Sequence, residues 1–425
     1  MPRTLCTEVP AAVGQSVRVA GWVHRLRKLG SLVFLQLRDR TGMIQVVLEG
    51  DIAATPLSHE DVVEVTGHVA AEPRAVGGAE VRAESLTILA HADLLPFEIN
   101  RKDIRAGLDV QLDHRVLALR HPKPHAALQV QAELIEGFRE FLSGRGFTEI
   151  HTPKLVSTGT EGGSEVFEVK YFERKAYLAQ SPQFYKQMMV GSGFEQVFEV
   201  GPVYRAEEHN TSRHLNEYVS LDIEMGFIRG EEELMDLETE MLQSMFGRVA
   251  ERRSEALALH GAVAPEFTEI PRVPLAEAQE ILQRRFRKAS PPGNLDPEGE
   301  QLICQYIGGP ELVFLTRYPL SKRPMYAMPA PESPELSASF DLLFRGLEVT
   351  TGGQRIHDYR MLVNSMEGRG LNPADFESYL EVFRLGMPPH GGFAIGAERL
   401  TARLLGLANV REASAFPRDR TRVSP

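Results

Sequence analysis

Arginine, glutamate and histidine side chains gather in a predicted β-hairpin between residues 196 and 225. A polar loop, residues 206–213, joins two segments with strand character. Arg205 stands at the base of this loop, and Arg213 and His214 stand at its far end. A guanidinium group is suited to hold a phosphate through two parallel hydrogen bonds. The pattern predicts a nucleotide-phosphate site, while a solvated hairpin with surface ion pairs is the alternative interpretation.

The second half of this hairpin, residues 214–225, alternates between polar and apolar side chains. A two-residue period is typical of a strand with one buried face. In the first half, residues 196–205, Arg205 falls on the same face as Glu199 and Gly201. We therefore expect a polar sheet face beside the loop. The polar positions of the second half are Asn216, Tyr218, Ser220, Asp222 and Glu224.

Three stretches of the chain resemble the signature motifs of the class II aminoacyl-tRNA synthetases, subclass IIb. Residues 146–153 resemble motif 1, the hairpin around Arg205 resembles motif 2, and residues 391–400 resemble motif 3. They occur in the family's order, and the resemblance covers nearly the whole chain. It is strongest to the aspartyl members of archaea and eukaryotes. The resemblance implies an N-terminal all-β OB barrel and an α+β class II catalytic domain built on a mainly antiparallel sheet.

The resemblance also implies an ATP-dependent ligase that joins L-aspartate to tRNA through an aspartyl adenylate. The reaction needs two negatively charged partners held in line and their charge neutralised, without a side-chain nucleophile. Arg205 and Arg399 are the predicted catalytic residues: Arg205 bridges the α-phosphate and the attacking carboxylate, and Arg399 binds phosphate beside helix amides. Without the motif, Arg399 would be interpreted as a helix-surface arginine. The other predicted ATP-binding residues are Glu207, Arg213, His214, Leu215, Glu348, Gly396, Ala397 and Glu398.

A predicted strand within residues 342–358 supplies the metal ligands that the resemblance implies. Carboxylates suit Mg²⁺, which takes few protein ligands beside substrate phosphates. Glu348 is the predicted main ligand, with Thr351 and Asp341 as helpers. Taken alone, each of these acids would more often be a surface carboxylate than a metal ligand. Two glycines, at 352 and 353, predict a close approach of the backbone to the ligand.

Selection of aspartate rests on two predicted cations. A pocket for the β-carboxylate should present Lys186 and Arg355, because an amide would leave a buried charge unpaired, at a cost of roughly several kcal/mol. Asparaginyl relatives have an apolar residue followed by an acid where this chain has Lys186 and Gln187. The alternative is that Lys186 is an exposed helix residue. The complete set of predicted aspartate-binding residues is Glu161, Gln183, Lys186, Arg205, Thr351 and Arg355.

Residues 1–100 predict a small β domain for the tRNA anticodon. Five strand-like runs and a tight turn at residues 39–42 fit an OB barrel. By resemblance, Phe34 and Gln45 contact the central anticodon base, although Phe34 also fits a barrel-core residue. His24 replaces a tryptophan typical of enzymes specific for the aspartate tRNA. The smaller ring predicts relaxed reading of the third anticodon base, and thus charging of both tRNA(Asp) and tRNA(Asn).

The rest of the chain predicts a hinge and a catalytic domain. Residues 101–125 are polar and proline-punctuated, and residues 126–425 form the catalytic domain. A helix from Ala126 to about Ser143 precedes a short strand that ends at Pro153. In the family these form a homodimer interface, whereas the residues alone fit an ordinary amphipathic helix. Residues 261–310 have no predicted role.

Composition limits the class of protein. The net charge of −11 argues against general nucleic-acid binding, but basic residues gather in the first half of the N-terminal domain. Two isolated cysteines exclude a disulfide framework or zinc site. With neither a long apolar run nor a hydrophobic leader, the sequence predicts a cytoplasmic protein without membrane association.

Three competing functions remain open at this stage. An asparagine–tRNA ligase is opposed by Lys186 and Gln187. A non-catalytic paralogue that only binds tRNA is opposed by the presence of Arg205, Arg399 and Glu348. An amidating enzyme built on the same catalytic core is opposed by the attached anticodon-type barrel.

Overall fold

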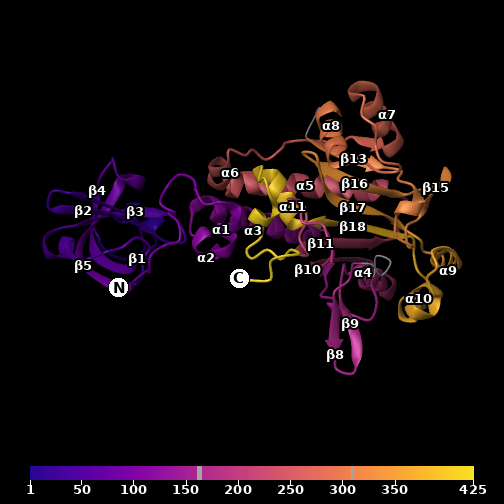
Figure 1. Cartoon of the computed structure of the whole chain (residues 1–425), viewed down its shortest axis with the longest axis horizontal. Helices are drawn as coiled ribbons and strands as arrows, with labels where there is room; N and C mark the ends of the chain where they lie inside the picture. Colours follow the sequence, from indigo (N-terminus) through magenta and orange to yellow (C-terminus); the bar gives the residue numbers. More distant parts are fainter. Residues whose placement is uncertain (160–164, 308–310) are drawn as a thin grey trace. The chain divides into compact units, whose positions relative to one another are not determined.

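The computed structural model describes residues 1–159, 165–307 and 311–425, and the chain forms two compact units, Met1–His121 and Pro122–Pro425 (Figure 1). The functional boundaries predicted above, with a hinge at 101–125, stay a prediction. Within the described ranges, every helix is too short or too polar to cross a membrane.

The first unit contains a closed five-stranded barrel, as predicted. Its strands pair in the order β1-β2-β3-β5-β4, and alternating side chains such as Val19, Leu35, Leu37 and Val65 fill its interior. The strands are β1 (Ser16–Leu29), β2 (Leu32–Arg38), β3 (Met43–Leu48), β4 (Val62–Ala71) and β5 (Ala79–Ala90). Short helices η1 (Cys6–Ala12), η2 (Gly50–Ala54) and η3 (Val76–Gly78) flank them, and α1 (Leu108–Asp113) and α2 (Arg115–Ala118) follow.

The second unit is built on an eight-stranded sheet in the order β12-β13-β16-β17-β18-β11-β10-β6. Pairing is parallel at both edges and antiparallel between them, which confirms the predicted mainly antiparallel sheet. The short strand before Pro153 lies at one edge, as predicted. The strands are β6 (Thr148–Glu149), β10 (Gln196–Tyr204), β11 (Glu217–Gly226), β12 (Arg272–Pro274), β13 (Leu312–Thr316), β16 (Ser339–Phe344), β17 (Leu347–Arg355) and β18 (His390–Gly396).

Two small sheets accompany the large one. One has the order β7-β9-β8, from β7 (Leu155–Val156), β8 (Glu168–Tyr171) and β9 (Arg174–Leu178), and its β8–β9 hairpin projects outward (Figure 1). The other pairs β14 (Pro329–Ala330) with β15 (Ser333–Ser337). The helices are α3 (Pro122–Gly144), α4 (Gln183–Met189), η4 (Val190–Phe194), α5 (Glu232–Arg252), α6 (Ser254–His260), α7 (Leu275–Phe286), α8 (Pro297–Ile307), η5 (Leu320–Lys322), α9 (Tyr359–Gly368), η6 (Pro373–Phe376), α10 (Glu377–Arg384), α11 (Ala397–Leu405) and η7 (Val410–Ala413).

Helices α3, α5 and α11 cover one face of the large sheet (Figure 1). Their apolar stripes, including Phe138, Met241 and Leu400, pack against strand residues such as Ile223 and Phe393. Burial of this kind contributes about 1.5–3 kcal/mol for each large apolar side chain. This face is therefore the core of the unit.

Among the described residues, two clusters of helices pack on parts of the opposite face of the sheet. Helices α7 and α8 pack against β13 through a cluster that includes Leu282 and Val313. Helices α4, α9 and α10 form another cluster around Phe184 and Tyr379. Between these clusters the sheet presents polar side chains, and we call this region the open face.

Candidate active site

On the open face, polar side chains of neighbouring strands lie side by side in rows. Directly paired residues of adjacent strands point to the same side of a sheet. One such row contains, from strand to strand, Asp341, Thr351, Ala394, Asp222 and Glu199. The alternation predicted for 214–225 is confirmed, because Leu221 and Ile223 belong to the helix-side core.

A cleft with about 680 Å³ of empty space lies over one end of the open face. Ten of the predicted site residues line it: Arg205, Glu207, Arg213, His214, Leu215, Glu348, Thr351, Gly396, Glu398 and Arg399. The hairpin, β17 and the start of α11 thus converge on one cavity. It is also lined by Tyr218, Ser220, Val349, Ala394 and Val410, to which sequence reasoning gave no site role.

Arg399 connects three of the segments around the cleft. It lies in the first turn of α11 after the helix N-cap Gly396, as predicted. Its Nη1 donates to the backbone oxygen of Glu348 at 3.2 Å and lies 3.7 Å from that residue's carboxylate. Its Nε donates to the backbone oxygen of Arg213 at 3.3 Å. The guanidinium therefore stands between the hairpin loop and the acid-bearing strand.

The side-chain amide of Asn216 holds the hairpin loop by hydrogen bonds to its backbone. The Asn216 side chain donates to the backbone oxygens of Arg205 and Glu207 at 2.6 and 3.0 Å. Arg205 Nη1 lies 4.0 Å from Glu207 Oε1. Burial, with the nearby guanidinium groups of Arg399 and Arg213, lowers the pKa of His214 to about 4. His214 is therefore a neutral hydrogen-bonding group at pH 7.

Two predicted ATP-binding residues of motif 3 have structural contacts of their own. Ala397 is 2% exposed and belongs to the helix-side core, so its side chain does not line the cleft. The Glu398 carboxylate accepts the Val219 backbone N–H at 3.1 Å, and burial raises its pKa to about 7. Only the backbone of Ala397 is left for a nucleotide contact.

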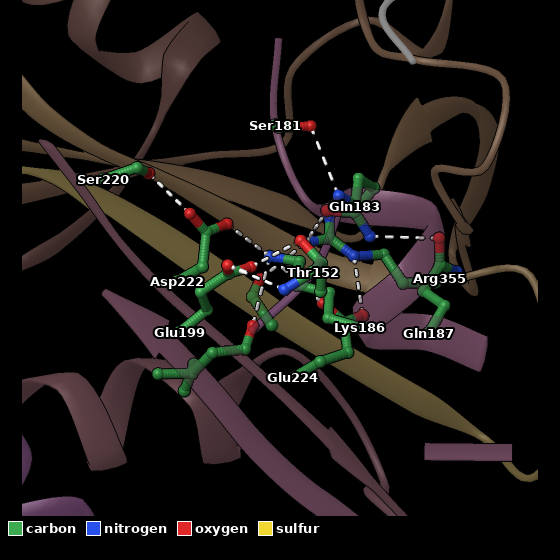
Figure 2. A network of polar contacts seen from close by, with 12 residues as sticks. Thr152, Ser181, Gln183, Lys186, Gln187, Glu199, Ser220, Asp222, Glu224 and Arg355 are labelled. Atoms are coloured by element: carbon green, nitrogen blue, oxygen red, sulfur yellow. Dashed lines mark hydrogen bonds and ion pairs between the residues drawn. The ribbon is translucent and has the colours of Figure 1, made fainter. Parts of the chain in front are cut away.

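The two predicted selectivity cations meet in a buried network beside the cleft, shown in Figure 2. Lys186 Nζ lies 3.0 Å from Asp222 Oδ1 and 3.4 Å from Glu224 Oε2. Arg355 donates through Nε to Glu224 Oε1 at 3.1 Å and through Nη2 to Gln183 Oε1 at 3.4 Å. Lys186 is 2% exposed, which excludes the alternative of an exposed helix residue.

The Glu224 carboxylate in this network is ionised because the cations are present. Burial alone would raise the pKa of Glu224, but Arg355 and Lys186 outweigh burial and hold it below its usual value. A Cβ at Gly392 would lie 2.4 Å from Glu224 Oε2, so glycine makes room for the buried carboxylate. Ser220, which lines the cleft, donates to Asp222 at 2.5 Å. The network and the cleft are therefore continuous along β11.

Two of the three predicted metal ligands, Glu348 and Thr351, line the same cleft, and Asp341 pairs with Thr351 on the neighbouring strand. Thr351 donates to Glu348 Oε1 at 3.2 Å, and Asp341 lies 2.9 Å from Arg323 in an ion pair. Desolvation, and next the negative charge of Asp341, raise the pKa of Glu348. Across the described ranges, no group of three or more His, Cys, Asp or Glu is arranged to hold a metal. Mg²⁺ needs only one or two carboxylates when phosphates supply the rest, so these residues fit a substrate-borne Mg²⁺.

Sequence reasoning missed Glu300, in the region that had no predicted role. Glu300 lies on α8, accepts a hydrogen bond from Arg213, and is 9% exposed. Burial raises its pKa to about 7. Helix α8 packs on the β16–β17 turn so closely that a Cβ at Gly346 would lie 2.7 Å from the Gln301 Cα. Only the three-dimensional structure brings this carboxylate to the hairpin.

Close packing inside the protein explains why residues 352 and 353 are glycines. A Cβ at Gly352 would lie 2.5 Å from the Phe340 ring and 2.6 Å from the Phe393 Cβ. At Gly353 it would lie 2.7 Å from the Ala338 backbone oxygen. These glycines admit core aromatics and a neighbouring strand, and the close approach of a ligand to them stays a prediction.

The predicted anticodon residues occupy two environments of the barrel unit. Phe34 and Gln45 are half-buried, and Phe34 alternates with the core residue Leu35 and pairs with Arg27. Gln45 donates to Glu80 at 2.9 Å. Phe34 and Gln45 thus lie on the outer surface of β2 and β3, which argues against Phe34 as a core residue.

His24 lies apart, at a β-bulge, and is 6% exposed. Its Nδ1 is 2.8 Å from Arg38 Nη1, and Arg38 pairs with Glu60 at 2.7 Å. Burial and the Arg38 charge lower the pKa of His24 to about 4. His24 borders a second cavity, with about 1190 Å³ of empty space, beside residues 92–100.

One predicted aspartate-binding residue, Glu161, lies outside the described residues.

Comparisons with known proteins agree with this arrangement. Residues 107–420 match the family model for tRNA synthetases of class II (D, K and N), and residues 17–89 match the model for an OB-fold nucleic acid binding domain. The aspartate–tRNA(Asp/Asn) ligase of Deinococcus radiodurans is 50% identical over 100% of this chain and 99% of its own length. That of Thermus thermophilus is 50% identical over the full length of both. The asparaginyl-tRNA synthetase of Pyrococcus horikoshii, solved with asparaginyl-adenylate, superposes with a TM-score of 0.93 at 33% identity over 100% of both chains.

Proposed function

Because this chain belongs to the class II tRNA synthetases of the D, K and N type, with an OB-fold domain before the catalytic part, we propose that it is an aspartate–tRNA ligase. It activates L-aspartate with ATP and transfers the aspartyl group to tRNA(Asp) and tRNA(Asn). Relatives 50% identical over the full chain are named for both tRNAs, which supports the relaxed specificity.

One observation carries the choice of aspartate: two buried cations next to a phosphate-type cleft. Lys186 and Arg355 present only hydrogen-bond donors, and side-chain contacts through Asp222 and Glu224 link them to the cleft residue Ser220. A β-carboxylate can accept from both cations through its two oxygens, whereas asparagine offers one acceptor oxygen and would turn its NH2 donor group toward the other cation. A site built this way rejects the uncharged isostere, because one of its buried donors would face the amide nitrogen and lose an acceptor.

The activation step follows from positioning and charge neutralisation. The α-carboxylate of aspartate attacks the α-phosphorus of ATP in line, and pyrophosphate leaves. In the proposal Arg205 bridges the attacking carboxylate and the α-phosphate, while Arg399 and Arg213 hold phosphate oxygens. Fixed guanidinium groups at the developing charge need no reorganisation during the reaction. The base side of the nucleotide would lie toward Glu207.

Mg²⁺ is the proposed cofactor, carried in with the nucleotide. Glu348 would be its main protein ligand, with Thr351 and Asp341 as helpers. Bound there, the ion would neutralise phosphate charge. The position of Glu348 and Thr351 on the cleft, with Asp341 on the adjacent strand, supports this.

The barrel unit is proposed to read the anticodon. Phe34 offers an aromatic face for stacking on a splayed base, and Gln45 offers an amide for hydrogen bonding. His24 would contact the third anticodon base without distinguishing the two tRNAs. The adenylate formed in the catalytic unit is then attacked by the terminal 3′-hydroxyl of the bound tRNA.

Two further features belong to the proposal. The edge strand β6 and helix α3 are the proposed surface for a homodimer, because an uncovered sheet edge favours pairing with a second chain. The activity is assigned to the cytoplasm, where tRNAs are charged.

The test separates aspartate from asparagine activation. Amino-acid-dependent exchange between ATP and pyrophosphate should proceed with aspartate and stay near background with asparagine. Exchange driven by asparagine would favour the asparagine–tRNA ligase suggested by the fold similarity to the Pyrococcus enzyme. Absence of exchange with either amino acid, with tRNA binding intact, would favour a non-catalytic tRNA-binding protein.

A further inference from the structure

A series of hydrogen bonds continues from Arg355 away from the cleft. Arg355 donates to Gln183 Oε1 at 3.4 Å, and Gln183 Nε2 donates to Gln187 Oε1 at 3.0 Å. Gln187 Nε2 lies 2.7 Å from His390 Nε2, and His390 Nδ1 lies 2.9 Å from the Pro388 backbone oxygen. Figure 2 shows Gln183, Gln187 and Arg355 close together. Two amides in series thus connect a histidine to a selectivity cation.

The direction of this series is set at its far end. The Pro388 carbonyl can only accept, so His390 carries a proton on Nδ1. A neutral imidazole then has a lone pair on Nε2 and accepts from the Gln187 amide nitrogen. The Gln187 carbonyl must face the other way, where Tyr379 donates to it at 3.0 Å and Gln183 donates at 3.0 Å.

The members of the series are sealed from water. Gln187 and His390 are 0% exposed, Tyr379 is 2% exposed and Gln183 is 4% exposed. If either amide turned over, a donor would face a donor, with no solvent to replace the lost partner. The orientation of both amides is therefore determined by the tautomer of His390.

We propose that His390 is a positioning residue for the selection of aspartate. As a neutral imidazole with its proton on Nδ1, it orients Gln187 and Gln183 so that a carbonyl oxygen faces the Arg355 guanidinium. This anchors the guanidinium beside Lys186, where both cations present donors to the substrate side chain. The inference rests on the proposed function and assigns part of its specificity to residues behind the pocket.

The charged surroundings of His390 are compatible with a neutral ring. Burial lowers its pKa to about 4, although Glu224 on β11 acts in the opposite direction. Arg355 on β17, with which His390 pairs in register, and His357 just beyond that strand lower the pKa further. From α10, Tyr379 and Phe383 contribute a hydroxyl and an uncharged ring. The ring is thus neutral throughout the range in which the enzyme would work.

A direct test reads the tautomer of His390 in the intact protein. Nitrogen-15 spectra of histidine-labelled protein should show an Nδ1-protonated neutral ring at pH 6–8, identified by its loss in His390→Gln. A proton on Nε2, or a cationic ring at pH 7, would overturn the proposal.

A functional test uses loss and rescue at the same position. His390→Leu removes the acceptor, so the KM for aspartate in pyrophosphate exchange should rise about tenfold or more, while the KM for ATP changes less than about twofold. His390→Gln, whose amide oxygen can replace Nε2, should restore most of the loss. Tyr379→Phe removes only one hydrogen bond to Gln187 and provides a milder variant should His390→Leu fail to fold. Equal changes in both KM values, or none, would refute the role.

A pH profile distinguishes positioning from simple packing. In Gln187→Glu a carboxylate replaces the donor, and only a protonated His390 can face it. The raised pKa of His390 would leave aspartate binding intact near pH 6 and weaken it toward pH 8, whereas the unsubstituted protein should show a flat profile. A flat profile in the variant would contradict the proposal.

His260→Gln is the matched control for these variants. His260 is half-buried and lies 3.0 Å from the backbone oxygen of Lys123, far along the chain from the pocket. It should leave the preference for aspartate over asparagine unchanged. If the unsubstituted protein fails to activate aspartate at all, the proposed function falls. If it is active and the His390 variants behave like His260→Gln, only this inference falls.

Discussion

At the scale of single residues, the predicted aspartate pocket contains two buried cations and two buried carboxylates. Lys186 and Arg355 are matched by Asp222 and Glu224, and all four are at most 7% exposed. Buried ion pairs gain little net stability, but the loss of one partner is costly because the other stays charged and dry. The arrangement fixes where the cations point, which matters more for selectivity than for stability.

Removal of the lysine tests this balance. Lys186→Leu should raise the KM for aspartate by about a hundredfold with little change in the KM for ATP, and should lower the free energy of unfolding by roughly 3–5 kcal/mol. Steady-state pyrophosphate exchange and urea unfolding measure the two effects. Lys154→Leu is the control, since Lys154 pairs with Glu199 at 2.7 Å on the same face but is 21% exposed. A similar rise in both KM values for Lys186→Leu would place the lysine outside the amino-acid pocket.

The Arg213–Glu300 pair makes a second prediction at this scale. Glu300→Gln weakens the contact that holds Arg213, so the KM for ATP should rise about 3–10-fold while the KM for aspartate stays constant. The control is Glu298→Gln on the same helix, where the carboxylate is largely exposed and pairs with Lys288. Equal behaviour of the two variants would mean that Glu300 does not serve the nucleotide cleft.

Sequence reasoning identified most residues of the cleft but few of their supports. Arg205 and Arg399 belong to motifs whose residue types indicate phosphate binding, and Glu348 belongs to the acid-bearing strand predicted within residues 342–358. Glu300 and His390 act through partners that are distant in sequence, and neither has a local pattern that marks it. Glu199 and Asp222 were visible only as polar positions of alternating strands.

At the scale of elements, the sheet separates chemistry from packing. The face toward α3, α5 and α11 is apolar, and the open face carries the ionisable groups. The alternation of residues 214–225 predicted this division, because a period of two assigns neighbours to opposite faces. The packing role of the glycines of β17 could not be predicted, since a pattern of glycines does not reveal whether a ligand or an aromatic side chain occupies the space.

One exception on the apolar face gives a pH-dependent prediction. Glu238 on α5 is 0% exposed, and burial raises its pKa to about 8. A folded-state pKa above the unfolded value means that the wild type loses stability as pH rises from about 4.5 to 8. Glu238→Gln removes this loss, so its advantage in the free energy of unfolding should grow with pH, to roughly a few kcal/mol at pH 8.

Urea unfolding at pH 5 and pH 8.5 measures this advantage. Glu251→Gln, an exposed change on the same helix, should show little difference between the two pH values. An advantage of Glu238→Gln that is the same at both pH values would show that Glu238 does not titrate late in the folded protein.

At the scale of the whole molecule, the proposed function assigns tRNA recognition to one compact unit and the chemistry to the other. The five strands of the barrel and their order along the chain were predicted because each has short apolar runs bounded by turn residues. Residues 261–310 could not be interpreted, since α7 and α8 acquire their role only by packing on β13 and the β16–β17 turn. Family motifs supplied the topology that periodicity alone does not determine.

If the barrel unit binds the anticodon and the other unit activates aspartate, a substitution in the barrel should impair tRNA charging without impairing activation. Phe34→Ala should lower the rate of tRNA charging about 5–100-fold, since stacking on a base is worth about 1–3 kcal/mol, but should leave pyrophosphate exchange unchanged. Aminoacylation and exchange measured on the same preparation provide the comparison. A matching loss in both reactions would indicate that Phe34 supports folding instead of binding the anticodon.

The most direct test of the whole account is aminoacylation of two separately purified tRNAs. With aspartate and ATP, the protein should charge both tRNA(Asp) and tRNA(Asn) with comparable efficiency, and with asparagine it should charge neither. Attachment of asparagine to either tRNA would contradict the proposed selection of aspartate by Lys186 and Arg355. Strict restriction of aspartate to tRNA(Asp) would contradict the relaxed anticodon reading proposed for His24.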